Sequence, residues 1–132
     1  MGNLGNEKIN LAYVDDEEHL LIIIKELLEN FVDEDKLNLK LYDSGLKCLE
    51  DFSKMEAPAD FTVVTDINMP SMTGIELMEK LKAMNSGIPV YICSAFDHHN
   101  YKKQAKSLGA EGFFTKPIDV SELLGQIFPA LA

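Results

Sequence analysis

Short apolar runs alternate along the chain with longer segments in which apolar residues recur at helical spacing. Four runs predict buried strands, because each is short and bounded by polar or turn-forming residues. They cover residues 9–14, 61–65, 90–93 and 112–115. A fifth run, residues 37–42, alternates apolar and polar side chains, which is typical of a strand at the edge of a sheet.

Between these runs, apolar positions three or four residues apart predict five helices. The predicted helices cover residues 20–31, about 43–54, 74–85, 97–108 and 118–128. Strands that alternate with helices predict right-handed βαβ units and a parallel sheet covered on both faces. We expect an α/β flavodoxin-like (βα)5 fold with strand order 2-1-3-4-5, because this order places the alternating run at an edge.

Length and composition narrow the class of protein. The chain has 132 residues, enough for one domain, which we expect over residues 8–132 after a short polar extension at residues 1–7. Its 12 basic and 22 acidic residues give a net charge of −10, which argues against nucleic-acid binding by this chain alone. The longest strongly apolar stretch, residues 20–24, is too short to insert in a membrane.

The N-terminus has neither a basic region nor a long apolar region, so no signal peptide is predicted. Cys48 and Cys93 are the only cysteines, and they lie inside a predicted helix and a predicted strand without metal-ligand spacing. We expect both to be buried, reduced thiols of a cytoplasmic protein.

Polar residues follow four of the predicted strands directly. Asp15 and Asp16 follow the first, Asp66 follows residues 61–65, Ser94 follows residues 90–93, and Lys116 follows the last strand. Because the carboxyl ends of parallel strands meet at one edge of a sheet, we expect these side chains to form one site. The site would contain three carboxylates, one hydroxyl and one ammonium group.

Three clustered carboxylates need a cation. Two carboxylates 5 Å apart repel by about 3 kcal/mol at an effective dielectric constant of 20. An all-oxygen acidic site suits Mg²⁺, so we predict a magnesium cofactor bound near Asp15, Asp16 and Asp66. The alternative for the adjacent pair is a helix cap, and one of the two is expected to cap the first helix, but two acids exceed what capping needs.

Lys116 and Ser94 each have a structural alternative. Lys116 precedes Pro117, which disfavours a helical conformation, so it could be a solvated loop residue. We expect it instead to face the acids, where an ammonium group neutralises both them and a bound phosphoryl group. Ser94 could cap the turn into the fourth helix, or its hydroxyl could donate a hydrogen bond to a phosphoryl oxygen.

Together these groups indicate phosphoryl transfer to a nucleophilic carboxylate. The chain has no glycine-rich phosphate loop and no candidate base for serine or cysteine chemistry. His19, His98 and His99 lack zinc-binding spacing, so we interpret them as solvated.

Four motifs now point to a family. They are Val14-Asp15-Asp16, residues 65–70 with Gly74, Ser94-Ala95, and Thr115-Lys116-Pro117. In this order and at these spacings, the chain resembles the receiver domains of two-component response regulators over about residues 8–130. It most closely resembles the single-domain kind typified by the bacterial chemotaxis regulator.

The resemblance implies specific roles at the carboxyl edge. Asp66 would accept a phosphoryl group from a histidine kinase or a histidine phosphotransfer protein, catalysing only its own phosphorylation and dephosphorylation. Asp16, Asp66 and the backbone carbonyl of Asn68 would bind Mg²⁺, and Asp15 would act through water. Lys116 would pair with Asp66 and then with the phosphoryl group.

The resemblance also implies a switch formed by Ser94 and Phe113. Ser94 would move to hydrogen-bond the phosphoryl oxygen, and the aromatic side chain three residues before Lys116 would then turn inward. The family more often has threonine and tyrosine at these positions. Because Phe113 has no hydroxyl, we expect its movement to depend on packing alone.

Two partner surfaces are expected. On a helical wheel, Leu21 and Ile22 lie outside the predicted core stripe, so they could dock the helical bundle of the kinase, as the first helix does in this family. The alternative is that they are buried beneath neighbouring side chains. A downstream protein would bind the surface of the fourth helix, fifth strand and fifth helix, where Tyr101 and Lys102 lie. The predicted core stripe of the first helix comprises Leu20, Ile23, Ile24, Leu27 and Leu28.

A rival function is an aspartyl-nucleophile phosphatase of the haloacid-dehalogenase type. Such enzymes usually carry a second acid two residues after the nucleophile, whereas here that residue is Asn68, which cannot exchange a proton in that role. We therefore favour a phosphorylation-switched signalling module. Both a stand-alone regulator and a part of a longer regulator fit the sequence.

Overall fold

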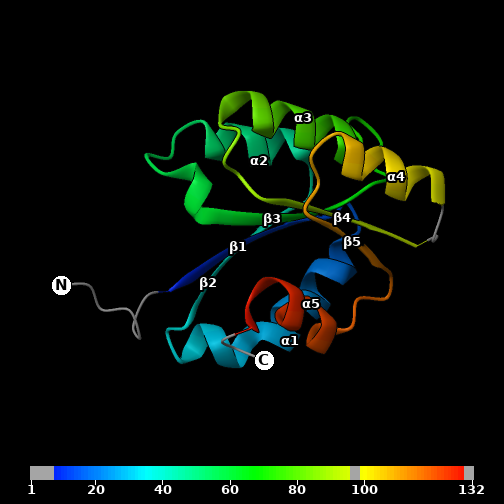
Figure 1. Ribbon diagram of the computed structural model, residues 1–132. Coiled ribbons are helices and arrows are strands. Elements are labelled where there is room, and N and C mark those ends of the chain that lie inside the picture. Colours follow the sequence, from blue (N-terminus) through cyan, green and yellow to red (C-terminus); the bar gives the residue numbers. More distant parts are fainter. Residues whose placement is uncertain (1–7, 96–98, 130–132) are drawn as a thin grey trace.

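The computed structural model describes residues 8–95 and 99–129, with the backbone only at residues 99–101. Five parallel strands form one sheet in the order β2-β1-β3-β4-β5 (Figure 1). This order and the edge position of β2 confirm the predicted topology. The strands are β1 (Ile9–Val14), β2 (Leu37–Tyr42), β3 (Phe61–Asp66), β4 (Val90–Ser94) and β5 (Gly112–Thr115).

Helices cover both faces of the sheet. In Figure 1, α2, α3 and α4 lie on one face, and α1 and α5 lie on the other. A short 3-10 helix, η2 (Pro58–Asp60), was not predicted and has its proline in the first turn. The α-helices are α1 (Glu18–Asp33), α2 (Gly45–Phe52), α3 (Gly74–Met84), α4 (His99–Ser107) and α5 (Val120–Ile127).

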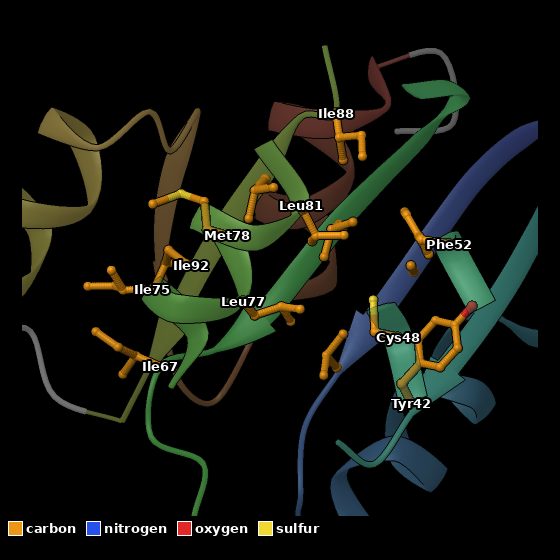
Figure 2. Packing of buried hydrophobic residues seen from close by; sticks show 14 of the residues in the cluster. Tyr42, Cys48, Phe52, Ile67, Ile75, Leu77, Met78, Leu81, Ile88 and Ile92 are labelled. Atoms are coloured by element: carbon orange, nitrogen blue, oxygen red, sulfur yellow. The ribbon is translucent and has the colours of Figure 1, made fainter. Parts of the chain in front are cut away.

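The larger core cluster lies between the sheet and α2, α3 and α4. Leu77, Met78 and Leu81 recur on one side of α3 and are completely buried. Figure 2 shows them in one cluster with Cys48 and Phe52 of α2. Each such side chain contributes about 1.5–3 kcal/mol of burial free energy, so this face fixes α3 firmly against the sheet.

The smaller core cluster corrects the predicted stripe of α1. Leu21, Ile24 and Leu28 form the buried stripe of this helix, at the spacing i, i+3, i+7. Ile23 and Leu27, which were predicted to be core residues, are 44% and 50% exposed. The helix is therefore rotated about its axis relative to the prediction, and the alternative that Leu21 is buried is correct.

The two cysteines are buried and unpaired, as predicted. Burial in apolar surroundings raises the pKa of Cys48 and of Cys93 to about 12. Neither thiol is therefore a reactive thiolate near neutral pH. Within the described ranges, no helix combines the length and apolar character that a membrane crossing requires.

Candidate functional site

Three carboxylates meet at the carboxyl edge of the sheet, as the sequence predicts. Asp66 is the last residue of β3, and Asp15 and Asp16 follow the end of β1. One carboxylate oxygen of each residue lies within 4.8 Å of the others. Asp15 and Asp66 are 0% and 5% exposed, whereas Asp16 faces solvent. The cluster thus has a buried part and an accessible part.

Lys116 lies across the two buried carboxylates. Its Nζ is 2.7 Å from Asp15 Oδ2 and 3.2 Å from Asp66 Oδ1. Its backbone N–H donates a 2.7 Å hydrogen bond to the carbonyl oxygen of Ser94, which fixes the start of the cis Lys116-Pro117 peptide beside the end of β4. The prediction that Lys116 faces the acids is confirmed, and the solvated alternative is wrong, because only 12% of its side chain is exposed.

The electrostatics of this site are unbalanced. Burial raises the pKa of Asp66 above its usual value, the Lys116 ammonium lowers it, and the charges of Asp15 and Asp16 raise it further. Burial alone lowers the pKa of Lys116, but close contact with Asp15 and the charge of Asp66 raise it above its usual value. Three ionised carboxylates and one ammonium leave two uncompensated negative charges.

A hard divalent cation fits this arrangement. One oxygen of each of the three carboxylates lies within 4.8 Å of the others, which is close enough for them to hold a hard cation with oxygen ligands such as Mg²⁺. Asp15 Oδ2 is buried, and its close partner within the described part of the chain is the Lys116 ammonium group at 2.7 Å. Asn68 is exposed at the same edge, two residues beyond Asp66.

The aspartate pair does not cap α1, contrary to expectation. The N-cap residue of α1 is Glu17, and its side chain accepts no capping hydrogen bond. Asp15 Oδ1 instead accepts a 2.9 Å hydrogen bond from the backbone N–H of Glu17. This bond holds the loop after β1 so that the other oxygen of Asp15 faces Lys116.

Gly74 sets the position of Asp66 through the backbone. A Cβ atom at Gly74 would lie 2.2 Å from the carbonyl oxygen of Asp66 and 3.0 Å from the Cα of Ile67. The Gly74 N–H donates a 2.9 Å hydrogen bond to the carbonyl oxygen of Ile67. Thr73 and Glu76 form a capping box at the same turn. The start of α3 therefore packs directly on the backbone that carries Asp66.

The residues predicted to switch are close in sequence to this site but differ in environment. Ser94 is buried at the end of β4. Phe113 is half-buried and packs against the α3 and α4 side of the sheet, where it lines a cavity of about 110 Å³ with Lys102 and Ala105. Phe113 therefore lies next to α4 and not in the acid cluster.

Among the predicted docking residues, Leu21 belongs to the core and Ile22 is 52% exposed. The expectation that both lie outside the core is wrong for Leu21, because the buried stripe of α1 passes through it. Lys102 is exposed on α4. The side chain of Tyr101 lies outside the described residues.

Sequence reasoning missed an apolar depression beside Lys116. Tyr13, Ile23 and Leu27 line a depression of about 110 Å³ together with Lys116 and Pro117. The Tyr13 hydroxyl lies 3.8 Å from Cys93 Sγ, and burial raises the pKa of Tyr13. Tyr13 gave no functional signal, because in the sequence it is one apolar position of a strand.

The parallel sheet carries an acid cluster at its carboxyl edge, as the resemblance to receiver domains implies. A model of the response regulator receiver domain matches residues 11–128, nearly the whole chain. The chain belongs to this family of two-component signalling domains.

The curated relatives are longer proteins. The chain is 30% identical to the transcriptional regulatory protein ZraR of Klebsiella oxytoca, and the match covers 98% of this chain and 28% of that protein. It is 28% identical to the response regulator protein TmoT of Ectopseudomonas mendocina, over 98% of this chain and 58% of that protein. The chain thus spans a part of the length of these relatives.

Solved structures share the fold. A response regulator receiver domain protein from Clostridium thermocellum is 25% identical, with a TM-score of 0.78 over 92% of this chain and 93% of that chain. The CheX–CheY–BeF3–Mg²⁺ complex from Borrelia burgdorferi is 19% identical, with a TM-score of 0.78 over 100% of this chain and 96% of that chain. That complex carries magnesium, as its name states.

Proposed function

We propose that Asp66 is the phosphoryl acceptor of a signalling switch and that a histidine kinase or histidine phosphotransfer protein is the donor. The observation that carries this proposal is the buried carboxylate of Asp66 beside Lys116 at the accessible edge of the sheet. An Asp66 oxygen attacks the phosphorus atom, and the bond between phosphorus and the donor's imidazole nitrogen breaks. The nitrogen keeps the electron pair and takes a proton, and Asp66 becomes an acyl phosphate.

The residues fit a Mg²⁺ cofactor. Asp16, Asp66 and the backbone carbonyl of Asn68 would hold the ion, with Asp15 acting through water. When bound, Mg²⁺ neutralises phosphoryl oxygens and supplies two positive charges to the acid cluster. The two uncompensated negative charges of the cluster support this assignment.

Lys116 and Ser94 complete the site in this proposal. Lys116 compensates Asp66 before transfer and then binds a phosphoryl oxygen, because its ammonium group lies 3.2 Å from Asp66 Oδ1. The hydroxyl of Ser94 donates a hydrogen bond to another phosphoryl oxygen. The chain would act on itself only, through its own phosphorylation and dephosphorylation, in the cytoplasm where the donor holds its phosphohistidine.

The response to phosphorylation is proposed to pass from Ser94 to Phe113 and then to a downstream protein. The cavity beside Phe113 supports an inward movement of its ring toward α4. Lys102 at the same cavity would contact the partner. We expect Phe113→Ala to be phosphorylated normally but to lose the phosphorylation-dependent change in amide hydrogen exchange of α4. An unaltered exchange response in this variant would contradict the proposed switch.

Kinase docking is proposed to use the exposed part of α1. Ile22, Ile23 and Leu27 are apolar and exposed, and the last two line the depression beside Lys116. Ile22→Lys should slow transfer from the kinase while the free energy of unfolding stays within about 0.5 kcal/mol of the wild type. Leu21→Lys is unsuitable as a docking test, because it places a charge in the core.

The proposed function is tested with acetyl phosphate and Mg²⁺, followed by intact-protein mass spectrometry. We expect one phosphoryl group per chain on wild type and none on Asp66→Asn. Chelation of Mg²⁺ should abolish labelling of the wild type. Labelling of Asp66→Asn at the wild-type rate would overturn the assignment, and many turnovers of diverse phosphate esters would favour the phosphatase alternative.

A further inference from the structure

An apolar pocket adjoins the acid cluster on the side away from Lys116. It has a volume of about 420 Å³ and lies among the loops that follow β1, β2 and β3. We call it the methionine pocket and define it by Asp16, Leu46, Met69 and Met72, which line it. The pocket shares Asp16 with the acid cluster.

The walls of the methionine pocket are apolar and adaptable. Met69 is 8% exposed and anchors the pocket to the core, whereas Leu46 is 58% exposed at its rim. Met72 occupies the space that a side chain at Gly45 would need, since its Sδ lies 2.8 Å from the position of a Cβ there. Flexible thioether side chains accommodate varied apolar groups, so the pocket suits an inserted side chain.

The pocket is one of two apolar depressions that flank the acid cluster. The depression at Ile23 and Leu27 includes Lys116, and the methionine pocket includes Asp16. Even a small transient interface buries roughly 500 Å² on each partner, which extends roughly 12 Å from its centre. A protein that brings a histidine to Asp66 therefore contacts the surface on both sides of the acid cluster.

The charge at the rim further restricts the occupant. Asp16 and Asp43 both line the pocket, and Asp43 forms an exposed ion pair with Lys47 at 2.9 Å. The chain as a whole carries a net charge of −10. Lys47 offsets Asp43, and a bound Mg²⁺ would offset Asp16, so the preference rests on the net charge of the chain. An apolar side chain with a lysine or arginine beside it matches this acidic protein better than an acidic segment does.

We propose that the methionine pocket receives an apolar side chain, flanked by a basic residue, of the protein that donates the phosphoryl group to Asp66. The inference rests on the proposed function and adds a second contact on the far side of the acid cluster from α1. Acetyl phosphate is too small to reach the pocket and Asp66 together. The pocket therefore affects transfer from a protein donor and leaves transfer from acetyl phosphate unchanged.

The test compares two donors on Leu46→Lys. The protein donors are the histidine kinases encoded in the same genome, each autophosphorylated with labelled ATP, and the small donor is acetyl phosphate. We expect Leu46→Lys to reduce the rate of transfer from the fastest kinase about tenfold and to keep the acetyl phosphate rate within about twofold of the wild type. Leu46→Ala, which adds no charge, should give a smaller reduction with the same donor dependence.

Met84→Lys is the matched control. Met84 is also an exposed apolar side chain, at 40%, but it ends α3 away from the acid cluster, so both rates should match the wild type. Equal kinase rates for Leu46→Lys and the wild type would overturn the inference, as would an equal fall with both donors. Labelling by acetyl phosphate without transfer from any kinase would overturn it too, but would leave the role of Asp66 intact. Failure of every donor, acetyl phosphate included, would instead contradict the proposed function.

Discussion

The amino and carboxyl edges of the sheet, where the parallel strands begin and end, both carry ion pairs between neighbouring elements. The balance of charge differs between the two edges. At the amino edge, Glu111 accepts a 2.8 Å hydrogen bond from the backbone N–H of Val90, and its other oxygen lies 3.4 Å from Lys82 Nζ. At the carboxyl edge, Lys116 contacts two carboxylates that are almost completely buried.

The amino edge is electrically balanced and partly solvated. One carboxylate faces one ammonium, and the exposed fractions of the Lys82 and Glu111 side chains are 19% and 39%. At the carboxyl edge, one ammonium faces three acids, and burial raises the pKa of Asp66. The difference indicates that the amino edge holds α3, β4 and β5 together, whereas the carboxyl edge keeps an excess of negative charge that a cation can neutralise.

The sharpest test of this difference is neutralisation of one acid at each edge. We expect Asp66→Asn to lose all labelling by acetyl phosphate, because the amide cannot act as the nucleophile. Glu111→Gln should be labelled at the wild-type rate. Intact-protein mass spectrometry measures both variants, and a loss of labelling in Glu111→Gln would show that the two edges are not functionally separate.

A methyl group at Gly74 should disturb the carboxyl edge through the backbone. Gly74→Ala forces atoms apart near the Asp66 carbonyl, so we expect a loss of about 1–3 kcal/mol in the free energy of unfolding and slower labelling. Urea denaturation measures the first quantity.

Gly125→Ala is the control for that variant. Gly125 lies within α5 and has open space around its Cβ position. Alanine there should stabilise the protein by about 0.5–1 kcal/mol, because it removes the helix cost of glycine. Equal destabilisation by both substitutions would refute the special role of the Gly74 contact.

Magnesium and pH should act on stability through the same acids. At a Mg²⁺ concentration ten times its dissociation constant, we expect a gain of about 1.4 kcal/mol at neutral pH. Thermal unfolding with Mg²⁺ and with chelator measures this gain. Asp16→Asn, which removes one proposed ligand and leaves the buried pair in place, should reduce it, and an equal gain in that variant would argue against the site.

Without Mg²⁺, the sign of the pH dependence follows from the raised pKa of Asp66. The folded chain holds the proton of the Asp66 carboxyl group to higher pH than the unfolded chain does. The contribution of Asp66 to stability therefore falls as the pH rises above 3.8, the usual pKa of this group. Asp66→Asn should flatten this part of the curve. The raised pKa of Lys116 affects stability in the alkaline range. The stabilising contribution of its ammonium group is lost as the pH rises above 10.5, the usual pKa of lysine. A wild-type stability that rose through the acidic window relative to Asp66→Asn would contradict the inferred shift.

The smallest expected effect belongs to the amino edge. Glu111→Gln loses a partly exposed ion pair but keeps an acceptor for the Val90 N–H, so we expect a loss below about 1 kcal/mol. Glu111→Ala leaves that buried N–H without its acceptor and should cost about 1–3 kcal/mol. A similar loss in both variants, measured by urea denaturation, would show that the ion pair with Lys82 matters more than its exposure suggests.

Much of the fold followed from local sequence pattern. Short apolar runs with polar ends located the strands, and the alternating run at residues 37–42 correctly indicated an edge. The orientation of α1 did not follow, because its apolar residues occupy too much of the helix circumference to define one stripe. Leu21 and Ile23 are both apolar and only two residues apart, and only contact with the sheet decides that Leu21 is buried and Ile23 exposed.

In the candidate site, too, some features followed from the sequence and others only from the tertiary structure. The sequence by itself determined which chemical groups end the strands, and the parallel topology that it predicts brings Asp15, Asp66 and Lys116 to one edge. Tertiary structure alone decided that Lys116 lies closer to Asp15 than to Asp66, that Gly74 touches the backbone of Asp66, and that apolar depressions flank the acids. The physical reason is range: strand ends follow from neighbours in the chain, whereas distances and cavities depend on side chains from several elements packing together.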